Sequence, residues 1–343
     1  MGDIIKNTKK YLIMFVIFVL IVLLTFNSIY DKESLNLIIK NIKQINIVYI
    51  LICLLIIFLY FLLQGIYMKT ILKALNKKIT LKKGIFYSMI EFYFSGITPS
   101  STGGQPVQLY YMTKDKIPVR KSYITLMLNT IYFKLIMLIL GIIVLVFNNG
   151  YVFSNKFIYI FFFILGFIVD LLIVVICYFL IFKQKLIRKS LNKLISIGSH
   201  FKVFKTKLEC INVDETLKRY SDEIKFIKSH KKIVLFNFIL TFIQRLLLFS
   251  IAYVIYRALG FNSKTYFDLL IIQVSVQISI EALPLPGGAG LSEGMFHNIF
   301  LILFTSKLAD VGMLLTRTFS FYIPLIICGI TVLIYNLVKG KVK

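Results

Sequence analysis

The chain has 343 residues, and 58% of them are hydrophobic, well above the apolar content of soluble globular domains. This composition excludes a soluble enzyme domain and predicts an integral membrane protein. The formal net charge of +25 does not indicate nucleic-acid binding, because the Lys and Arg residues gather at the ends of apolar segments rather than along a soluble face. That distribution is the one that orients membrane helices.

The N-terminal part predicts two spans. Three lysines precede an apolar run, Tyr11 to Ile29, which is long enough to cross the bilayer and places the N-terminus in the cytoplasm. The run lacks the small-residue cleavage pattern of a signal peptide, so we interpret it as an uncleaved first helix. The stretch Asp31 to Gln44 predicts an interfacial helix, and Ile47 to Tyr67 predicts the second span.

The next apolar segment is too short to span the membrane. Gly84 to Ile97 falls short of the ~20 residues that a crossing helix needs. It ends at TPSSTGGQP, Thr98 to Pro106, where prolines and glycines disfavour a continuous helix. Basic clusters lie on both sides of this segment, so the chain is expected to enter and leave by the cytoplasmic face. The sequence predicts a re-entrant hairpin.

Four further spans complete the path. Ser122 to Phe147 and Phe157 to Phe182 predict helices that cross outward and back, and Ile233 to Tyr256 and Val311 to Val338 do the same later. Residues 183–232 are rich in Lys and Arg and predict a cytoplasmic segment with amphipathic helices near anionic headgroups. This segment is too short for an independent catalytic domain.

A second interrupted segment lies between the last two spans. Tyr266 to Leu283 enters the membrane, the sequence breaks at LPLPGGAGLSEG, and Met295 to Thr305 leaves again. Its flanks carry little charge, so this hairpin is expected to enter from outside, opposite to the first. We therefore expect an all-α integral membrane protein, a single polytopic domain over residues 1–343. It has about six transmembrane helices plus two oppositely oriented re-entrant hairpins, as in inverted-repeat transporters.

Charged residues within these apolar segments are the first candidates for a site. Glu91 and Glu281 precede the two breaks, where a charge costs roughly 2.5 to 3.5 kcal/mol, so a functional role is the default interpretation. They would receive a cationic headgroup or carry protons; the alternative is an ion pair with Lys134, Arg245 or Arg317. Arg245 and Arg317 are suited to a lipid phosphate. Their alternatives are a buried ion pair for Arg245 and interfacial snorkelling for Arg317.

The two breaks supply the other candidates. Unwound backbone at membrane depth persists only where it is packed in protein or lines a polar cavity, and its N–H groups suit an anion. The alternative is a packing turn. The candidate substrate-binding residues are Ser100, Ser101, Thr102, Gly103, Gly104 and Gln105 in the first break, and Pro286, Gly287, Gly288, Gly290 and Glu293 at the second. Glu293 is equally suited to capping the following half-helix.

No catalytic, metal or cofactor motif is recognised. The four Cys and three His residues are scattered and have no ligand spacing. Interhelical hydrogen bonds account for the other polar residues within the spans, namely Asn129, Asp170, Gln273 and Gln277.

Both breaks carry a family resemblance. TPSSTGGQPVQLYY, and Glu281 with LPLPGGAGLSEG, resemble signature segments of the transmembrane domain of bacterial lysylphosphatidylglycerol synthases, a family of MprF-like flippases with stand-alone relatives. The resemblance covers essentially the whole chain. It implies translocation of aminoacylated phosphatidylglycerol or another anionic lipid. In full-length members of the family, a separate cytoplasmic domain makes the aminoacylated phosphatidylglycerol. Because the sequence ends at Lys343, soon after the last span, we expect a stand-alone member without that domain.

The leading hypothesis is a translocase that moves a membrane phospholipid across the bacterial cytoplasmic membrane, with both termini in the cytoplasm. Neither a cofactor nor nucleic acid is expected. A homo-oligomer and a separate lipid-modifying enzyme are compatible partners. The alternatives are a phosphatidylglycerol lysyltransferase, as the family name suggests, and a small-solute or ion transporter on the same architecture.

Overall fold

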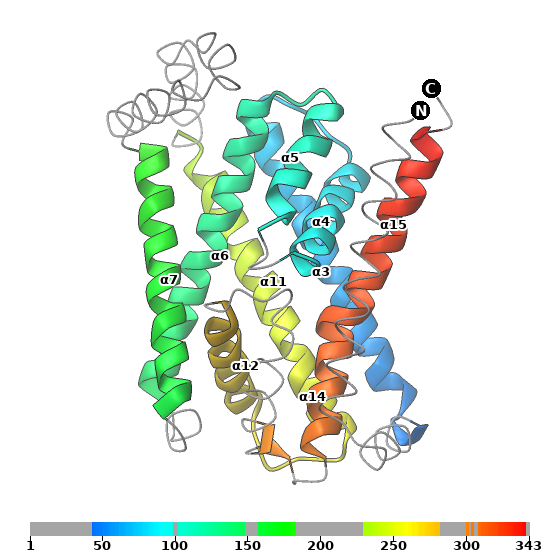
Figure 1. The fold of residues 1–343 in the computed structure, drawn as a ribbon, viewed down its shortest axis with the longest axis vertical. Helices are drawn as coiled ribbons and strands as arrows, with labels where there is room; N and C mark the ends of the chain where they lie inside the picture. The colour runs from blue at the N-terminus through cyan, green and yellow to red at the C-terminus, as the bar shows by residue number, and fades with distance from the viewer. Residues whose placement is uncertain are drawn as a thin grey trace, which may run out of the picture.

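A computed structural model describes residues 43–98, 102–147, 157–182, 229–281, 300–301, 303–304 and 308–340. These residues are helical apart from short caps and turns (Figure 1). The expected first span, nearly all of the interfacial stretch Asp31 to Gln44 and nearly all of the basic segment 183–232 lie outside the described residues.

Five helical segments in the described part are long and apolar enough to cross a membrane. They belong to α3 (Ile47–Ala74), α6 (Val119–Phe147), α7 (Phe157–Phe182), α11 (Lys231–Ala258) and a composite last span of α14 (Ala309–Arg317), π-helical η3 (Thr318–Tyr322) and α15 (Ile323–Gly340). Each of the expected spans that falls on described residues is therefore confirmed. The π-helical turn inside the last span was not expected.

The first half-span element is a hairpin of α4 (Leu81–Gly96) and α5 (Gly104–Lys114). With 16 and 11 residues at 1.5 Å per residue, both are shorter than the ~30 Å hydrocarbon core. Figure 1 shows that α4 starts and α5 ends at the same end of the bundle, as expected for re-entry. Helix α5 resumes at Gly104, before Pro106, because a proline in the first turn leaves no hydrogen bond unmade.

The second half-span element, α12 (Tyr266–Glu281), rises from the opposite end of the bundle (Figure 1). Thr265 and Asp268 fix its start: the Asp268 carboxylate accepts from the Thr265 backbone N–H at 2.8 Å, and the Thr265 hydroxyl accepts from the Asp268 N–H at 3.3 Å. This reciprocal pair is a capping box. The helix ends at Glu281, and the break that follows lies outside the described residues.

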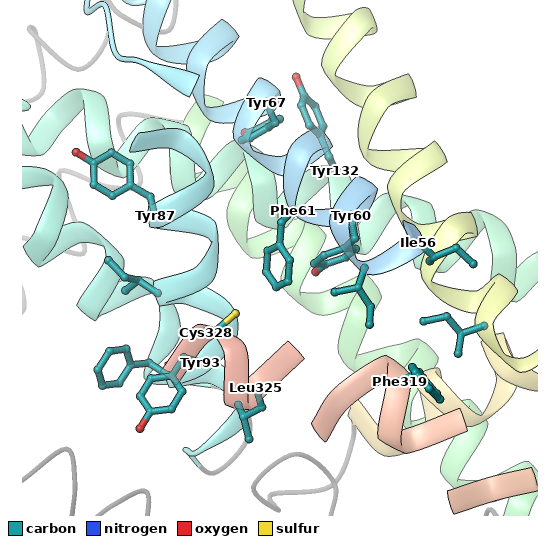
Figure 2. Close-up of a cluster of buried hydrophobic side chains, with 14 of the residues drawn as sticks. Ile56, Tyr60, Phe61, Tyr67, Tyr87, Tyr93, Tyr132, Phe319, Leu325 and Cys328 are labelled. Atoms are coloured by element: carbon teal, nitrogen blue, oxygen red, sulfur yellow. The ribbon is translucent and has the colours of Figure 1, made fainter. Parts of the chain in front are cut away.

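The larger hydrophobic cluster holds the first hairpin in place. Figure 2 shows Leu325 and Cys328 of α15 beside Tyr93 of α4, and these three side chains are buried. On α3, the buried rings of Tyr60 and Phe61 pack against Phe92 of α4, with centroids 6.1 and 5.6 Å from its own. Helix α4 is thus enclosed between two spanning helices, which is the condition for an interrupted helix to persist at membrane depth.

A second cluster surrounds α12. Its buried members come from α6, α7, α11 and α12, and include Leu140, Phe163, Phe249 and Val274. At Gly166 of α7 the backbones approach closely, because a Cβ there would lie 1.9 Å from the carbonyl oxygen of Ile278. Small residues at such crossings allow membrane helices to pack without side chains between them.

Helix α7 lies at the edge of the described bundle. Only 22% of the residues in its most apolar stretch are buried, against 33 to 39% of those in the other four spans. Its outward side chains, such as Leu172, which is 53% exposed, are apolar and suit contact with lipid tails.

We predict that Gly166→Ala destabilises the protein, because the new methyl group would overlap the Ile278 carbonyl and force α7 and α12 apart. The expected loss is at least ~1 to 3 kcal/mol, the usual cost of overpacking, measured as thermal unfolding in detergent. Leu172→Ala, on the outward face of the same helix, should change stability far less. Unchanged stability of Gly166→Ala would show that this close contact does not exist.

Candidate functional site

Three charged side chains meet where α6, α7 and α12 come together. The Lys134 ammonium of α6 donates to Asp170 Oδ1 of α7 at 2.5 Å and to Glu281 Oε2 of α12. The side chains of Lys134, Asp170 and Glu281 are only 11%, 1% and 12% exposed. Gln277, one turn earlier on α12, donates to Glu281 Oε1 at 2.9 Å. Charges this deep in a membrane protein are costly and mark functional sites by default. We call Lys134, Asp170 and Glu281 the charge triad.

The close helix contact at Gly166 explains this placement. Asp170 lies one turn beyond Gly166 on α7, and Glu281 lies one turn beyond Ile278 on α12. Residues one turn apart share a helix face. The point where the two backbones touch therefore brings the two carboxyl groups together, and Lys134 reaches both from α6.

A second charged group lies on α11. The Arg245 guanidinium carbon is 3.9 Å from the ring centroid of Phe133 and 5.7 Å from that of Tyr60, and its Nη1 makes a long hydrogen bond of 3.5 Å to the Tyr60 hydroxyl. Among the described residues, no carboxylate oxygen lies within 4.0 Å of it, and its Nε–H makes no hydrogen bond. A guanidinium with unused donors in aromatic surroundings suits an anionic ligand.

Glu91 of α4 lies near Arg245. It is partly exposed, accepts a hydrogen bond of 3.3 Å from Ser95 on the next turn, and is close enough for its charge to interact with that of Arg245. The two are not in direct ion-pair contact. In the described part of the chain, the ion-pair alternative considered from the sequence therefore fits Glu281 and does not fit Glu91.

Phe133 joins the two charged groups. Its ring contacts the Arg245 guanidinium, and the ammonium of the adjacent Lys134 lies 5.1 Å from the centroid of the same ring. Cations are attracted to the face of an aromatic ring. Glu91 lies near Arg245 and Glu281 contacts Lys134, and both cations approach the Phe133 ring. The two acids that precede the breaks therefore lie in one region of the bundle.

The tip of the first hairpin lies beside Glu91. The Thr98 hydroxyl accepts from the Gly103 backbone N–H at 2.9 Å and donates to the Phe94 carbonyl at 2.6 Å, which closes the turn. A Cβ at Gly104 would lie 2.0 Å from Ser95 Oγ and 2.6 Å from the Glu91 carbonyl oxygen. Only glycine fits there, and the N-terminus of α5 therefore packs directly against the Glu91 turn.

Gln105 extends the hairpin to α6. Its side-chain amide donates to the Thr130 hydroxyl at 2.5 Å, one turn before Lys134. Thr102 lies in the turn that leads into α5. The other expected residues of this break, Ser100 and Ser101, lie outside the described residues.

The expected residues of the second break also lie outside the described residues. These are Pro286, Gly287, Gly288, Gly290 and Glu293, and their part in a site stays a prediction.

Arg317 lies at the end of α14, directly before the π-helical turn. The residue is only 5% exposed, and its guanidinium carbon is 5.7 Å and 5.9 Å from the ring centroids of Phe321 and Tyr322. It therefore does not snorkel to an interface. π-Helical turns are frequent at functional sites.

Among the described residues, no group of three or more His, Cys, Asp and Glu side chains could hold a metal ion.

Comparison with known proteins identifies the family. The model of the lysylphosphatidylglycerol synthase TM region matches residues 11–328. The chain belongs to this family. A relative from Archaeoglobus fulgidus, named as a UPF0104 membrane protein, is 24% identical over 306 residues, which cover 88% of this chain and 90% of that protein. The resemblance seen in the two glycine-rich segments is confirmed, and the family member is a membrane protein.

The sequence interpretation of this family member missed two residues of the site. Asp170 was assigned to interhelical hydrogen bonding, and Phe133 was not singled out. A signal for Asp170 exists: Lys134 and Asp170 lie equally far along the chain from Ser122 and Phe182, the ends of their expected spans on the same side of the membrane. Equal depth in adjacent antiparallel helices makes an ion pair feasible. No such signal marks Phe133 among 32 phenylalanines.

We predict that Lys134→Met destabilises the protein strongly, because it leaves two buried carboxyl groups without their counter-ion. Breaking a buried ion pair costs ~3 to 5 kcal/mol. The double variant Lys134→Met with Asp170→Asn restores the net charge of the triad and should recover part of the loss in thermal unfolding. Equal stability of the single and double variants would contradict the ion pairing described here.

Proposed function

We propose that this protein is a phospholipid translocase, which moves a lipid headgroup through the interior of the bundle while the tails stay in the membrane. One observation carries the proposal: two half-span helices, α4 and α12, enter from opposite ends, and Glu91 and Glu281 lie near two cations, the partly buried Arg245 and the buried Lys134, which both approach the Phe133 ring. Half-span helices that meet near the midplane are how many transporters build a substrate site.

The family supports a lipid as the substrate class. The family is named after a synthase of lysylphosphatidylglycerol, which is a phospholipid. A membrane domain of this family is a reasonable carrier for a related lipid, such as aminoacylated phosphatidylglycerol or another anionic phospholipid.

Arg245 is the proposed phosphate ligand. Every phospholipid carries a phosphate, and a guanidinium binds phosphate through two parallel hydrogen bonds. Arg245 has donors to spare and no carboxylate within 4.0 Å in the described part of the chain. When a phosphate binds Arg245, the negatively charged side chain of Glu91 would move away from the guanidinium. The site would therefore have two states, one with Glu91 near Arg245 and one with phosphate bound there.

The proposed movement is an alternation between the two half-span elements. Helices α4 and α5 lie toward one end of the bundle and α12 lies toward the other (Figure 1), so each would close the site from its own side. Rocking one element against the spanning helices would open the site to one leaflet at a time. Gly104 and Gly166 lie at the contacts that such a movement changes.

We place the protein in the bacterial cytoplasmic membrane with its termini in the cytoplasm. Helices α3 and α5 carry Lys73 and Lys114 in their last turns, and both helices end at the end of the bundle where α15 also ends (Figure 1). Positive residues at one end of the spans indicate the cytoplasmic side.

The test uses purified protein in liposomes that contain fluorescent phospholipids, with a quencher that reaches only the outer leaflet. Wild-type protein should bring inner-leaflet lipid within reach of the quencher faster than empty liposomes do. Arg245→Gln should slow this by about tenfold or more, because a hydrogen bond to a charged group contributes roughly 1.5 to 3 kcal/mol. Arg245→Lys keeps the charge without the paired geometry and should lie between the two.

Two results would redirect the proposal. Binding of a soluble amino acid or ion, with no lipid movement by wild-type protein, would favour a small-solute transporter. Aminoacyl transfer from charged tRNA to phosphatidylglycerol by the purified chain would assign the lysyltransferase activity instead.

A further inference from the structure

The charge triad is unbalanced as built. One ammonium, that of Lys134, contacts two carboxyl groups, those of Asp170 and Glu281. With all three groups ionised the triad carries a net charge of −1, in a place where the side chains are 1 to 12% exposed. An uncompensated charge in such surroundings is expensive, and a carboxyl group that shares its site with another is commonly neutralised by a proton.

The geometry offers a place for that proton. The Asp170 and Glu281 carboxyl groups both contact the single Lys134 ammonium, so the two acids lie close together. Asp170 is 0% exposed, and its Oδ2 receives no hydrogen bond from the described residues. Two carboxylates repel each other and cannot hydrogen-bond, whereas a carboxylic acid donates to a carboxylate. One proton on the pair would supply the missing donor and bring the triad to neutrality.

The surrounding charged groups do not remove the imbalance. Of the groups described on the neighbouring helices, Arg245 of α11 and Glu91 of α4 interact with each other and oppose one another in charge, and the Tyr60 hydroxyl of α3 contacts Arg245. Gln277 of α12 is neutral and donates to Glu281. The extra negative charge therefore belongs to Asp170 and Glu281.

We propose that Asp170 and Glu281 form a proton-binding site, and that the binding and release of its proton drive the lipid movement. This inference rests on the proposed function. Glu281 is the group through which the proton enters and leaves, because it ends the half-span helix α12 and is the more exposed of the two carboxyl groups. Asp170, fully buried, holds the shared proton, and Lys134 offsets the remaining negative charge.

The cycle is balanced in charge. Hydronium from one side gives its proton to a carboxylate oxygen of the pair and leaves as water, so the triad changes from −1 to 0. On the other side an O–H bond of the pair breaks, water accepts the proton, and the triad returns to −1. The change in charge alters the attraction between α12 and the helices α6 and α7, and α12 is one of the two elements that closes the site.

The first experiment detects the proton directly and does not depend on lipid transport. Infrared spectra of the protein in lipid bilayers at pH 7 should show the carbonyl band of a buried carboxylic acid, at a pH where solvated Asp and Glu are ionised. The band should be missing in Asp170→Asn/Glu281→Gln and present in Asp268→Asn, which removes a partly exposed acid at the start of α12. A spectrum of the wild type without this band would overturn the proton site.

The second experiment tests the coupling in liposomes with and without a pH difference across the membrane. The wild-type rate of lipid movement should change by up to about tenfold per pH unit, because one unit corresponds to ~1.4 kcal/mol per proton, and a protonophore should abolish the change. Asp170→Asn should give a rate that the gradient does not alter. Arg245→Lys should be slower but keep its response to the gradient, because it leaves the triad intact.

The outcomes separate the two proposals. A wild-type rate that is measurable but unaffected by the gradient would overturn the coupling and leave the translocase standing. An absence of lipid movement under every condition would overturn the translocase and the coupling together, whereas the infrared band decides the proton site in either case.

Discussion

The contact between the half-span helix α12 and the spanning helices α6 and α7 is the constraint on which the rest depends. It is possible because Gly166 presents no side chain to the Ile278 carbonyl. Its consequence is a buried ion triad, because Asp170 and Glu281 lie one turn further along their helices and Lys134 joins them. In a membrane such charges are tolerated only where partners compensate them. The interrupted helix and the charged site therefore require each other.

Arg245 with Glu91, and the charge triad, suit different ligands. Arg245 and Glu91 interact without direct contact, so the guanidinium has donors available for an external anion. The triad is closed around Lys134, and a small cation such as a proton suits it better than a large ligand does. Phe133 contacts Arg245 and lies beside the Lys134 ammonium, so a change in either group alters the surroundings of the other. This arrangement links the proposed anion site to the proposed proton site.

The sequence was sufficient for the five spans that fall on described residues and for the first hairpin, because hydropathy and charge act along the chain and need no knowledge of packing. It also singled out Glu91 and Glu281, since acids in apolar runs are conspicuous. It did not determine which acid pairs with which base, because Lys134, Arg245 and Arg317 were all mid-span or near it. That choice depends on the helix contact at Gly166. Nor could it indicate the π-helical turn after Arg317, which has no composition signal.

Solid-state NMR of isotopically labelled protein in lipid bilayers tests the central claim most directly. The measurement is the dipolar coupling between Lys134 Nζ and the carboxyl carbons of Asp170 and Glu281. Direct ion pairing of one ammonium with both groups predicts strong coupling to each carbon. Coupling to neither carbon would mean that α12 does not reach α6 and α7 at this depth, and would contradict both the site and the function derived from it.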